Sequence, residues 1–281
     1  MIFGDYRIEI VSDSEFRLDG GAMFGVVPRV VWERVAPPDE LNRIRLQTHC
    51  LFIETPDERI LIETGIGEKW TEKQIEMFGI NREKTFAETL LEKTGCLPSD
   101  ISIVVNTHLH FDHCGGNTIY DERGAIVPQF PNARYLISES EFTHAENPSE
   151  RDRASYIAEN WNALRTSGQL ELKPDDYEVV KNLTMRKTRG HNAAMQTACL
   201  ESGGEKLFCF ADLVPTRHHL PFPWIMGFDL YPMETLANKK RIIRSAAEEK
   251  WLCLFYHDAD APLYQLTNKE GKFSAKEFAL S

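Results

Sequence analysis

The sequence lacks the features that would place it among disulfide-stabilised or thiolate-zinc proteins. Its six cysteines stand singly, without a Cys-x-x-Cys pair, so neither a disulfide framework nor a thiolate zinc site is expected. Most of them lie in apolar, strand-like stretches, and we expect small buried side chains there, including the one next to the histidine-rich motif described below. The cysteines are Cys50, Cys96, Cys114, Cys199, Cys209 and Cys253.

The sequence also lacks the features of a membrane segment, of a signal peptide and of a basic protein. No apolar run approaches the roughly 18 residues of a bilayer span, and residues 1–7 lack the basic and apolar regions of a secretion signal. We therefore expect a cytoplasmic protein with no membrane partner. The 43 acidic and 32 basic residues give a net charge of −11, which repels a phosphate backbone, so no nucleic-acid partner is expected.

Repeats, low-complexity tracts and Gly/Ser linkers are absent, which predicts a single domain over residues 1–281. Short strands and single helices in two strand-rich halves predict an α/β fold, a four-layer αβ/βα sandwich of two mixed β-sheets with helices on the outer faces. The predicted strands are Arg7–Val11, Gln47–Glu54, Arg59–Glu63, Ile101–Asn106, Arg134–Ser138, Leu183–Lys187, Gln196–Leu200, Lys206–Phe210 and Trp251–Tyr256. The predicted helices are Thr85–Thr94, Glu139–Asn147, Ser149–Ser167 and Met233–Glu249.

Two segments combine irregular patterning with many apolar residues. They are Leu18–Trp32, which contains Gly20-Gly21-Ala22-Met23-Phe24-Gly25, and Pro221–Pro232. Loops this hydrophobic pack onto each other or onto a neighbouring subunit, or they wall a pocket for an apolar substrate group. The sequence leaves both interpretations open.

The stretch Thr107-His108-Leu109-His110-Phe111-Asp112-His113 carries the strongest chemical signal. It concentrates three of the nine histidines and an aspartate in six residues, directly after an apolar run. Imidazole and carboxylate are donors that suit Zn²⁺, Fe or Mn, and in an extended strand end His108 and His110 project to the same side. The stretch predicts a metal site.

Three later segments repeat one design, in which an apolar stretch ends in a side chain that can bind a metal. Thr188-Arg189-Gly190-His191 places a histidine after a glycine turn. Phe208-Cys209-Phe210-Ala211-Asp212 ends in a carboxylate, and Leu252-Cys253-Leu254-Phe255-Tyr256-His257 ends in an imidazole. Together with the first motif, these segments predict one metal-binding constellation.

This combination resembles the metallo-β-lactamase superfamily of hydrolases. Residues 108–113 meet its His-x-His-x-Asp-His motif, Gly115-Gly116 follow, and x-Gly-His at 190–191, Asp212 and His257 keep the family's order over roughly residues 45–260. Two positions depart from the pattern. Glu63-Thr64-Gly65 stands where the family has Asp-Thr-Gly, and Ala211 replaces the glycine before Asp212. Neither departure removes a ligand, and we expect the first to alter the hydrogen bonds around the ligands.

The resemblance also implies which residue binds which metal. His108, His110 and His191 hold one ion, Asp112, His113 and His257 hold the other, and Asp212 bridges them. A bridging water loses its proton near neutral pH and attacks a carbonyl, while Asp112 or a nearby acid relays the proton. Asp112 and Asp212 are thus the expected catalytic residues. The N/O ligand set leaves Zn, Fe, Co and Mn open, with zinc preferred.

Within the superfamily, the chain looks most like the branch of quorum-quenching N-acyl-homoserine lactonases. The segment 212–219, Asp-Leu-Val-Pro-Thr-Arg-His-His, and an entrance loop at about 18–32 carry this likeness. The alternatives are an organophosphate or aryl-ester hydrolase, a thioesterase of the same superfamily, and a metal-dependent ligand sensor without turnover. A thioesterase of the glyoxalase II type resembles a catalytic domain followed by a basic helical extension, whereas only 24 residues follow His257.

We expect the substrate to be a small ester or lactone whose apolar part meets the two hydrophobic segments. The predicted substrate-binding residues are Met23, Phe24, His218, Phe222, Trp224 and Met226. His218 and His219 are ambiguous, because loop histidines contact a substrate or simply face solvent. The apolar N-terminal segment favours a homodimer, in which it would cover a neighbour's pocket.

Overall fold

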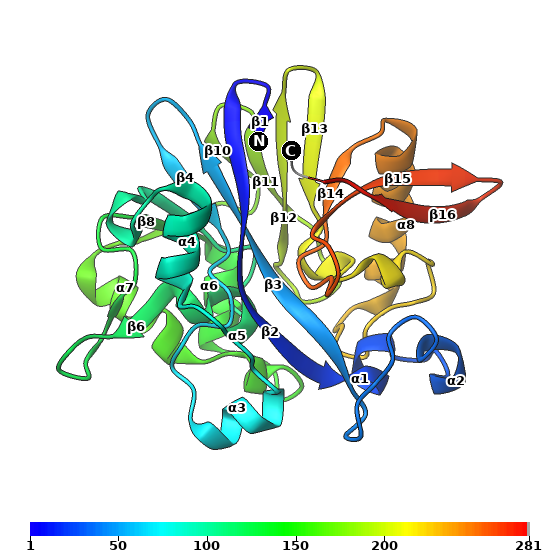
Figure 1. The fold of residues 1–281 in the computed structure, drawn as a ribbon, viewed down its shortest axis with the longest axis horizontal. Helices are drawn as coiled ribbons and strands as arrows, with labels where there is room; N and C mark the ends of the chain where they lie inside the picture. Colours follow the sequence, from blue (N-terminus) through cyan, green and yellow to red (C-terminus); the bar gives the residue numbers. More distant parts are fainter. Residues whose placement is uncertain (280–281) are drawn as a thin grey trace. The chain divides into compact units, whose positions relative to one another are not determined.

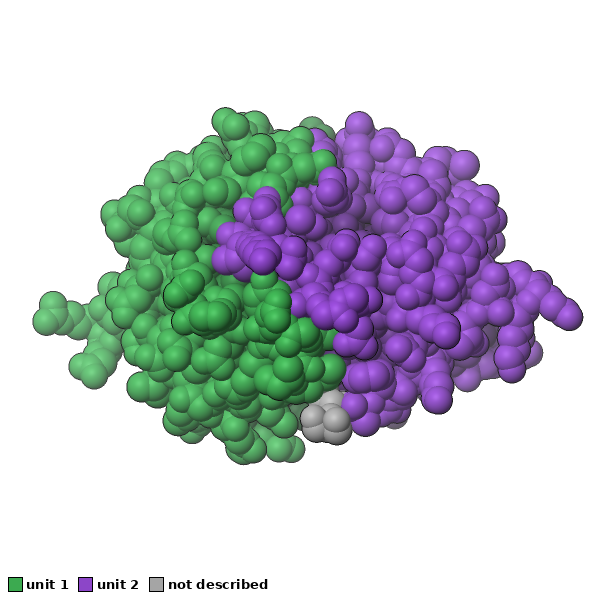
Figure 2. All heavy atoms as spheres, turned by 90° about the horizontal axis from the view of Figure 1, so that it is seen from above, with its two compact units in different colours: residues 1–14, 48–177 green, residues 15–47, 178–281 purple. Residues whose placement is uncertain are grey.

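The computed structural model describes residues 1–279, which divide into two compact units (Figure 2). Unit 1 comprises Met1–Ser14 and Thr48–Tyr177, and unit 2 comprises Glu15–Gln47 and the chain from Glu178 onward. The expectation of one domain stays a prediction. Within residues 1–279, we find no helix with both the length and the apolar character that crossing a bilayer requires.

The first sheet has seven strands in the order β1-β2-β3-β4-β5-β8-β9 (Figure 1). It is mixed, because β1–β2 and β3–β4 pair antiparallel, whereas β4, β5, β8 and β9 pair parallel. Parallel strands that are buried on both faces have nearly continuous apolar sequences. The buried strand Ile103–Val105, with the sequence Ile-Val-Val, is an example. The strands are β1 (Ile2–Phe3), β2 (Tyr6–Asp19), β3 (Arg43–Glu54), β4 (Arg59–Ile62), β5 (Ile103–Val105), β8 (Arg134–Ser138) and β9 (Leu170–Lys173).

The second sheet also has seven strands and runs in sequence order from β10 to β16. Strands β13 and β14 pair parallel, whereas the β12–β13 and β14–β15 pairs on either side are antiparallel. A separate two-stranded ribbon joins β6 (Thr118–Tyr120) to β7 (Ile126–Pro128). The strands of the second sheet are β10 (Tyr177–Val180), β11 (Leu183–Lys187), β12 (Gln196–Ser202), β13 (Glu205–Cys209), β14 (Leu252–Leu254), β15 (Leu263–Lys269) and β16 (Lys272–Glu277).

Local sequence signals start and stop the helices of unit 1. In α4 the Thr85 side chain accepts from the backbone of Glu88, whose carboxylate accepts from the backbone of Thr85, and Gly95 ends the helix in the left-handed region. The α-helices of unit 1 are α3 (Glu72–Phe78), α4 (Phe86–Thr94), α5 (Phe111–Cys114), α6 (Glu139–Glu146) and α7 (Asn162–Ser167). Its short 3₁₀ turns are η1 (Pro98–Asp100), η2 (Gly115–Asn117), η3 (Arg153–Ser155) and η4 (Ala158–Asn160).

The long helix α8 (Pro232–Glu248) packs its apolar stripe on the core of unit 2. Ile242, Ile243 and Ala246 join a buried cluster with Phe208 and Tyr264 of the second sheet. Pro232 begins the helix, at a position where its missing N–H costs nothing. The remaining helical elements of unit 2 are α1 (Gly20–Phe24), α2 (Arg29–Trp32), η5 (Ala211–Leu213) and η6 (Arg217–His219).

The α/β fold class with two mixed sheets is confirmed, and each predicted strand overlaps an observed one. All six cysteines are free, and five of them are buried. The predicted helix Ser149–Ser167 is wrong over most of its length, because only Asn162–Ser167 is α-helical. The preceding stretch instead forms two 3₁₀ turns, Arg153–Ser155 and Ala158–Asn160, on either side of an isolated β-bridge between Tyr156 and His110. The segment Leu18–Trp32 is not irregular either, since β2 continues to Asp19 and α1 and α2 follow.

Candidate metal centre

In unit 1 the predicted ligands lie in the loop and the short helix α5 that follow β5. His108, His110, Asp112 and His113 are all buried. The His108 ring centroid lies 4.6 Å from that of His110 and 4.0 Å from that of His113. The structure therefore brings the three imidazoles of the motif together within this unit.

Close packing of two loops fixes this motif. A Cβ atom at Gly115 would lie 2.1 Å from the carbonyl oxygen of Ile66, and one at Gly116 would lie 2.2 Å from that of Thr64. Only glycine permits this approach, which explains the Gly-Gly pair after the ligands. The backbone N–H of Thr64 in turn donates to the carbonyl of His113 at 2.9 Å.

Glu63 holds two of these histidines from the end of β4. Its Oε1 atom accepts from His113 Nδ1 at 3.2 Å and from the backbone and hydroxyl of Thr107. The Thr107 hydroxyl gives its proton to Glu63, so it accepts from His108 Nδ1 at 2.9 Å. Both rings thus carry their proton on Nδ1, and Nε2 is the atom that can coordinate a metal. Glu63 stands at the position where the family pattern has an aspartate.

A second buried carboxylate, Glu141 of α6, supports the motif from the other side of its loop. Its Oε1 atom accepts from the backbone N–H of Leu109 at 2.8 Å and from the Tyr156 hydroxyl at 3.2 Å. The Tyr156 ring packs edge-on against His110, with centroids 4.8 Å apart. These contacts orient the His110 side of the loop. No pattern in the sequence indicated a role for Glu141 or Tyr156.

In unit 2, Asp212 faces two histidines with its two carboxylate oxygens. Oδ2 lies 3.2 Å from Nε2 of His191, and Oδ1 lies 3.2 Å from Nε2 of His257. All three side chains are buried. They follow strands or turns as predicted, since Asp212 comes after β13 and His257 after β14.

The tautomers of these two rings show that the arrangement suits a cation. His257 Nδ1 donates to the carbonyl of Gln47 at 2.8 Å, and His191 Nδ1 donates to Asp229 Oδ1 at 3.0 Å. Because both partners only accept, Nδ1 of each ring carries a proton, and in the neutral form the lone pair of Nε2 faces an oxygen of Asp212. Acceptors facing each other at 3.2 Å repel unless positive charge lies between them. Imidazole and carboxylate together are a donor set for a divalent metal, so these residues fit one.

Both departures from the family pattern adopt left-handed backbone conformations. Ala211, where the family has glycine, has φ of +47°, and Glu63 has φ of +67°. This region costs a non-glycine residue roughly 1–2 kcal/mol. The strain is held in place by buried surroundings on both sides, since Glu63 and Ala211 are each less than 5% exposed.

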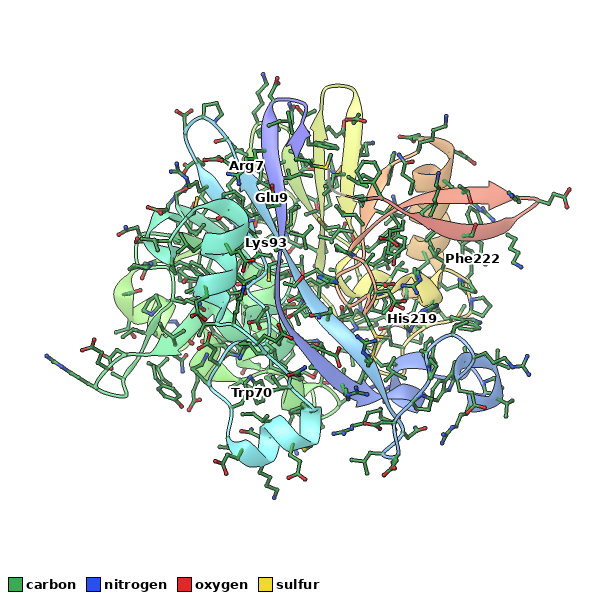
Figure 3. All side chains as sticks on the ribbon, in the orientation of Figure 1. Arg7, Glu9, Trp70, Lys93, His219 and Phe222 are labelled. Carbon is green, nitrogen blue, oxygen red and sulfur yellow. The ribbon has the colours of Figure 1, made fainter. Side chains whose placement is uncertain are left out.

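The predicted substrate-binding residues of unit 2 fall into two groups. Phe24 stacks between Trp32 and His219, at centroid distances of 5.3 and 4.7 Å, and meets the edge of Trp224. Phe222 instead packs against Phe273 of β16, at a centroid distance of 5.4 Å. Figure 3 shows Phe222 beside the β15–β16 hairpin, away from the labelled His219. Met23 and Met226 are buried.

His219 is a structural anchor, which settles one of the two histidines left open by the sequence. Its Nε2 donates to the carbonyl of Met23 at 2.9 Å, and its Nδ1 accepts from the Thr216 hydroxyl at 2.8 Å. Burial, assisted by the nearby charge of Lys239, lowers the pKa of His219 to about 3. The ring therefore stays neutral at physiological pH and ties α1 to η6.

His218 lines a cavity of about 140 Å³ within unit 2. Its lining combines apolar side chains with polar and charged ones, among them Arg217 and Asp260. Burial and the neighbouring charge of Arg217 lower the pKa of His218. The cavity is lined by Phe24, Val35, Ala36, Pro37, Ile44, Arg45, Thr216, Arg217, His218, Ala259 and Asp260.

Unit 1 contains an aromatic cluster that the sequence analysis did not identify. The ring of Phe111, between His110 and Asp112, lies 5.5 Å from Trp70 and 5.2 Å from Phe78 by centroids. Figure 3 labels Trp70 next to α3. The position of Phe111 inside the histidine motif could have indicated that it lies near the candidate metal centre. Trp70 and Phe78 belong to no sequence motif that could have indicated this.

Residues 43–257 match the model of the metallo-β-lactamase superfamily. The chain belongs to this superfamily. An N-acyl homoserine lactonase of Bacillus cereus is 28% identical over 238 residues, which cover 78% of this chain and 84% of the relative. The predicted resemblance is confirmed, and so is the prediction of a metal-dependent hydrolase related to lactonases.

Solved structures of superfamily members share the fold of this chain. A probable metal-dependent hydrolase from Staphylococcus aureus is 30% identical, with a TM-score of 0.89 and full coverage of both chains. The dizinc quorum-quenching lactonase AidC, solved with a product, is 21% identical, with a TM-score of 0.81 over all of this chain and 97% of its own. At that identity the second likeness concerns the fold alone.

Proposed function

We propose that this chain is a dinuclear metal-dependent lactonase that opens the ester bond of an N-acyl homoserine lactone or a related lactone. The proposal is supported by the family and by curated relatives that are N-acyl homoserine lactonases. It is also supported by the donor sets of the two units, each of which is buried and oriented by hydrogen bonds. Zinc is the proposed metal, since the solved lactonase AidC is a dizinc protein.

The position of Asp212 is the observation that carries the proposal. A bridging carboxylate directs one oxygen toward each of two metals, and the oxygens of Asp212 point toward two different histidines. The family pattern assigns those histidines, His191 and His257, to different ions. We therefore propose His108, His110 and His191 as ligands of one metal, and Asp112, His113 and His257 as ligands of the other.

Bound metals supply a water of lowered pKa and a Lewis acid for the lactone carbonyl. The residues of the chain set the geometry of this chemistry. Asp229 and the Gln47 carbonyl fix the rings of His191 and His257, and Glu63 fixes those of His108 and His113. Asp112 is proposed to hold the proton that passes to the leaving alkoxide.

The apolar part of the substrate is proposed to enter the cavity of unit 2. Two of its lining segments lie within six residues of a predicted ligand in the chain, Thr216–His218 after Asp212 and Ala259–Asp260 after His257. Its volume of about 140 Å³ and the apolar residues in its lining suit a short acyl chain. A homodimer without nucleic-acid or membrane partners, located in the cytoplasm, completes the proposal.

Two measurements test this function. Elemental analysis of the purified protein is expected to give about two metals per chain. An assay panel of acyl-homoserine lactones, simple lactones, aryl esters and phosphotriesters is expected to show turnover of lactones, with His110→Ala as the inactive control. A metal content near zero contradicts the mechanism. Turnover of aryl esters or phosphotriesters alone contradicts the lactone assignment.

A further inference from the structure

Glu63 receives hydrogen bonds that lead to two different predicted ligands. His113 donates to its Oε1 atom directly, at 3.2 Å, whereas His108 donates to the Thr107 hydroxyl, which donates to the same oxygen. The Glu63, His108 and His113 side chains each offer a ligand atom within 4.8 Å of the others. One carboxylate oxygen therefore sets the tautomer of both rings.

We infer that Glu63 is a positioning residue that couples the two metal sites, so that losing its charge weakens both metals together. The inference rests on the proposed function, in which His108 and His113 bind different ions. An imidazole that donates to a carboxylate is a stronger metal ligand than one that donates to a neutral group. Through His113 and Thr107, Glu63 exerts this effect on both ions at once.

The surroundings of Glu63 support a role tied to these histidines. The side chain is 3% exposed, and among the described residues 1–279 its Oε2 atom accepts only the long 3.4 Å bond from Asn106 Nδ2. Among residues 1–279, no lysine or arginine forms an ion pair with it, and His113 is its one ion-pair partner. The positive charge that balances the buried Glu63 carboxylate is therefore supplied by the imidazoles and by the metals proposed to bind them.

Asp229 offers a matched comparison, because its carboxylate fixes the ring of one predicted ligand only, His191. Its Oδ1 atom accepts from His191 Nδ1 at 3.0 Å, and its Oδ2 atom accepts from the Thr235 hydroxyl at 2.7 Å. Thr235 leads to no other predicted ligand. Loss of the Asp229 charge should therefore weaken one metal and leave the other close to its original affinity.

The test follows the loss of zinc from the purified full-length holoprotein across a graded series of chelator concentrations. Glu63→Gln keeps the shape of the side chain and removes its charge, and we expect both metals to be lost at 10- to 100-fold lower chelator strength. Asp229→Asn is expected to shift only one of the two. With cobalt in place of zinc, Glu63→Gln should change the absorption bands of both ions. The inference is overturned if Glu63→Gln shifts one metal only, or neither.

Glu63→Asp separates charge from packing. It restores the carboxylate, and we expect both metals to return toward wild-type retention relative to Glu63→Gln. Equal impairment of the two variants overturns the inference, because charge would then be irrelevant. If Glu63→Gln does not fold, Thr107→Val provides the test, because it removes the path from Glu63 to His108 and keeps the bond to His113. We then expect a shift of one metal only, and a shift of both or of neither overturns the inference. A wild-type content of one metal overturns both proposals, whereas two metals without lactone turnover overturns the substrate assignment alone.

Discussion

The Nε2 atom of His257 lies 3.2 Å from Oδ1 of Asp212, although the other nitrogen of that ring already donates to the carbonyl of Gln47. Two acceptor atoms therefore face each other in a buried site. Such a pair is stable when a cation lies near both, and it becomes a cost when the cation is removed. The proposed metal-binding role of the site thus has consequences for stability as well as for turnover.

Replacing Asp212 by asparagine should reduce metal binding without lowering the stability of the metal-free protein. The amide keeps the volume but cannot serve as an anionic bridge, so we expect the variant to retain about one metal per chain or fewer and to lose nearly all lactone turnover. Its metal-free form should be at least as stable as the metal-free wild type, because the NH₂ group can donate to a histidine. Elemental analysis and thermal unfolding with and without chelator check this. Full metal content in the variant would contradict the bridging role.

Acidification should destabilise unit 2 through His219. Its folded pKa of about 3 lies below the ordinary value of 6.5, so between these two values the unfolded chain binds the extra proton. The free energy of unfolding therefore falls as the pH drops below about 6.5, by up to about 1.4 kcal/mol per pH unit from this group. His219→Gln can still donate to Met23 and accept from Thr216. We expect the variant to show a shallower decline in denaturant unfolding measured from pH 7 to pH 4.5, and an equal decline would exclude His219 as its source.

Filling the cavity of unit 2 should change substrate preference without affecting the metals. Ala36→Leu adds three carbon atoms to its lining, and we expect KM for long-chain lactones to rise about 10-fold or more while short-chain lactones are less affected. Ala163→Leu is the control, since Ala163 lines a separate cavity in unit 1. Kinetics over a chain-length series test the prediction. Equal effects of the two substitutions would show that the unit 2 cavity does not hold the acyl chain.

Adding one methyl group at Gly115 should disrupt the metal-binding loop. The Cβ atom of Gly115→Ala would lie 2.1 Å from the Ile66 carbonyl oxygen, so we expect a loss of about 3 kcal/mol or more in stability, with reduced metal content. Gly124→Ala provides the comparison, because no atom lies within 4 Å of its Cβ and only the positive φ opposes it. That control should cost about 1–2 kcal/mol. Thermal unfolding and metal analysis distinguish the two variants.

The sequence predicted the α/β class and most strands because apolar runs and turn residues are local signals. It failed at Ser149–Ser167, where the bridge between Tyr156 and His110 opposes the helical pattern. It placed Phe222 and Phe24 in one predicted substrate-binding group, since both lie in apolar segments, and that role stays a prediction. Tertiary packing separates them, because Phe222 finds Phe273 on the second sheet.

The sequence by itself determined which residues are the candidate metal donors, because their residue types and spacing are chemical requirements that can be read along the chain. Only the tertiary structure decided which nitrogen can bind a metal in the rings of His108, His113, His191 and His257. The groups that fix the tautomers lie far away in the chain, 50 residues from His113 at Glu63, 38 from His191 at Asp229 and 210 from His257 at Gln47. No periodicity connects such partners, since only folding places their acceptors beside the imidazole protons.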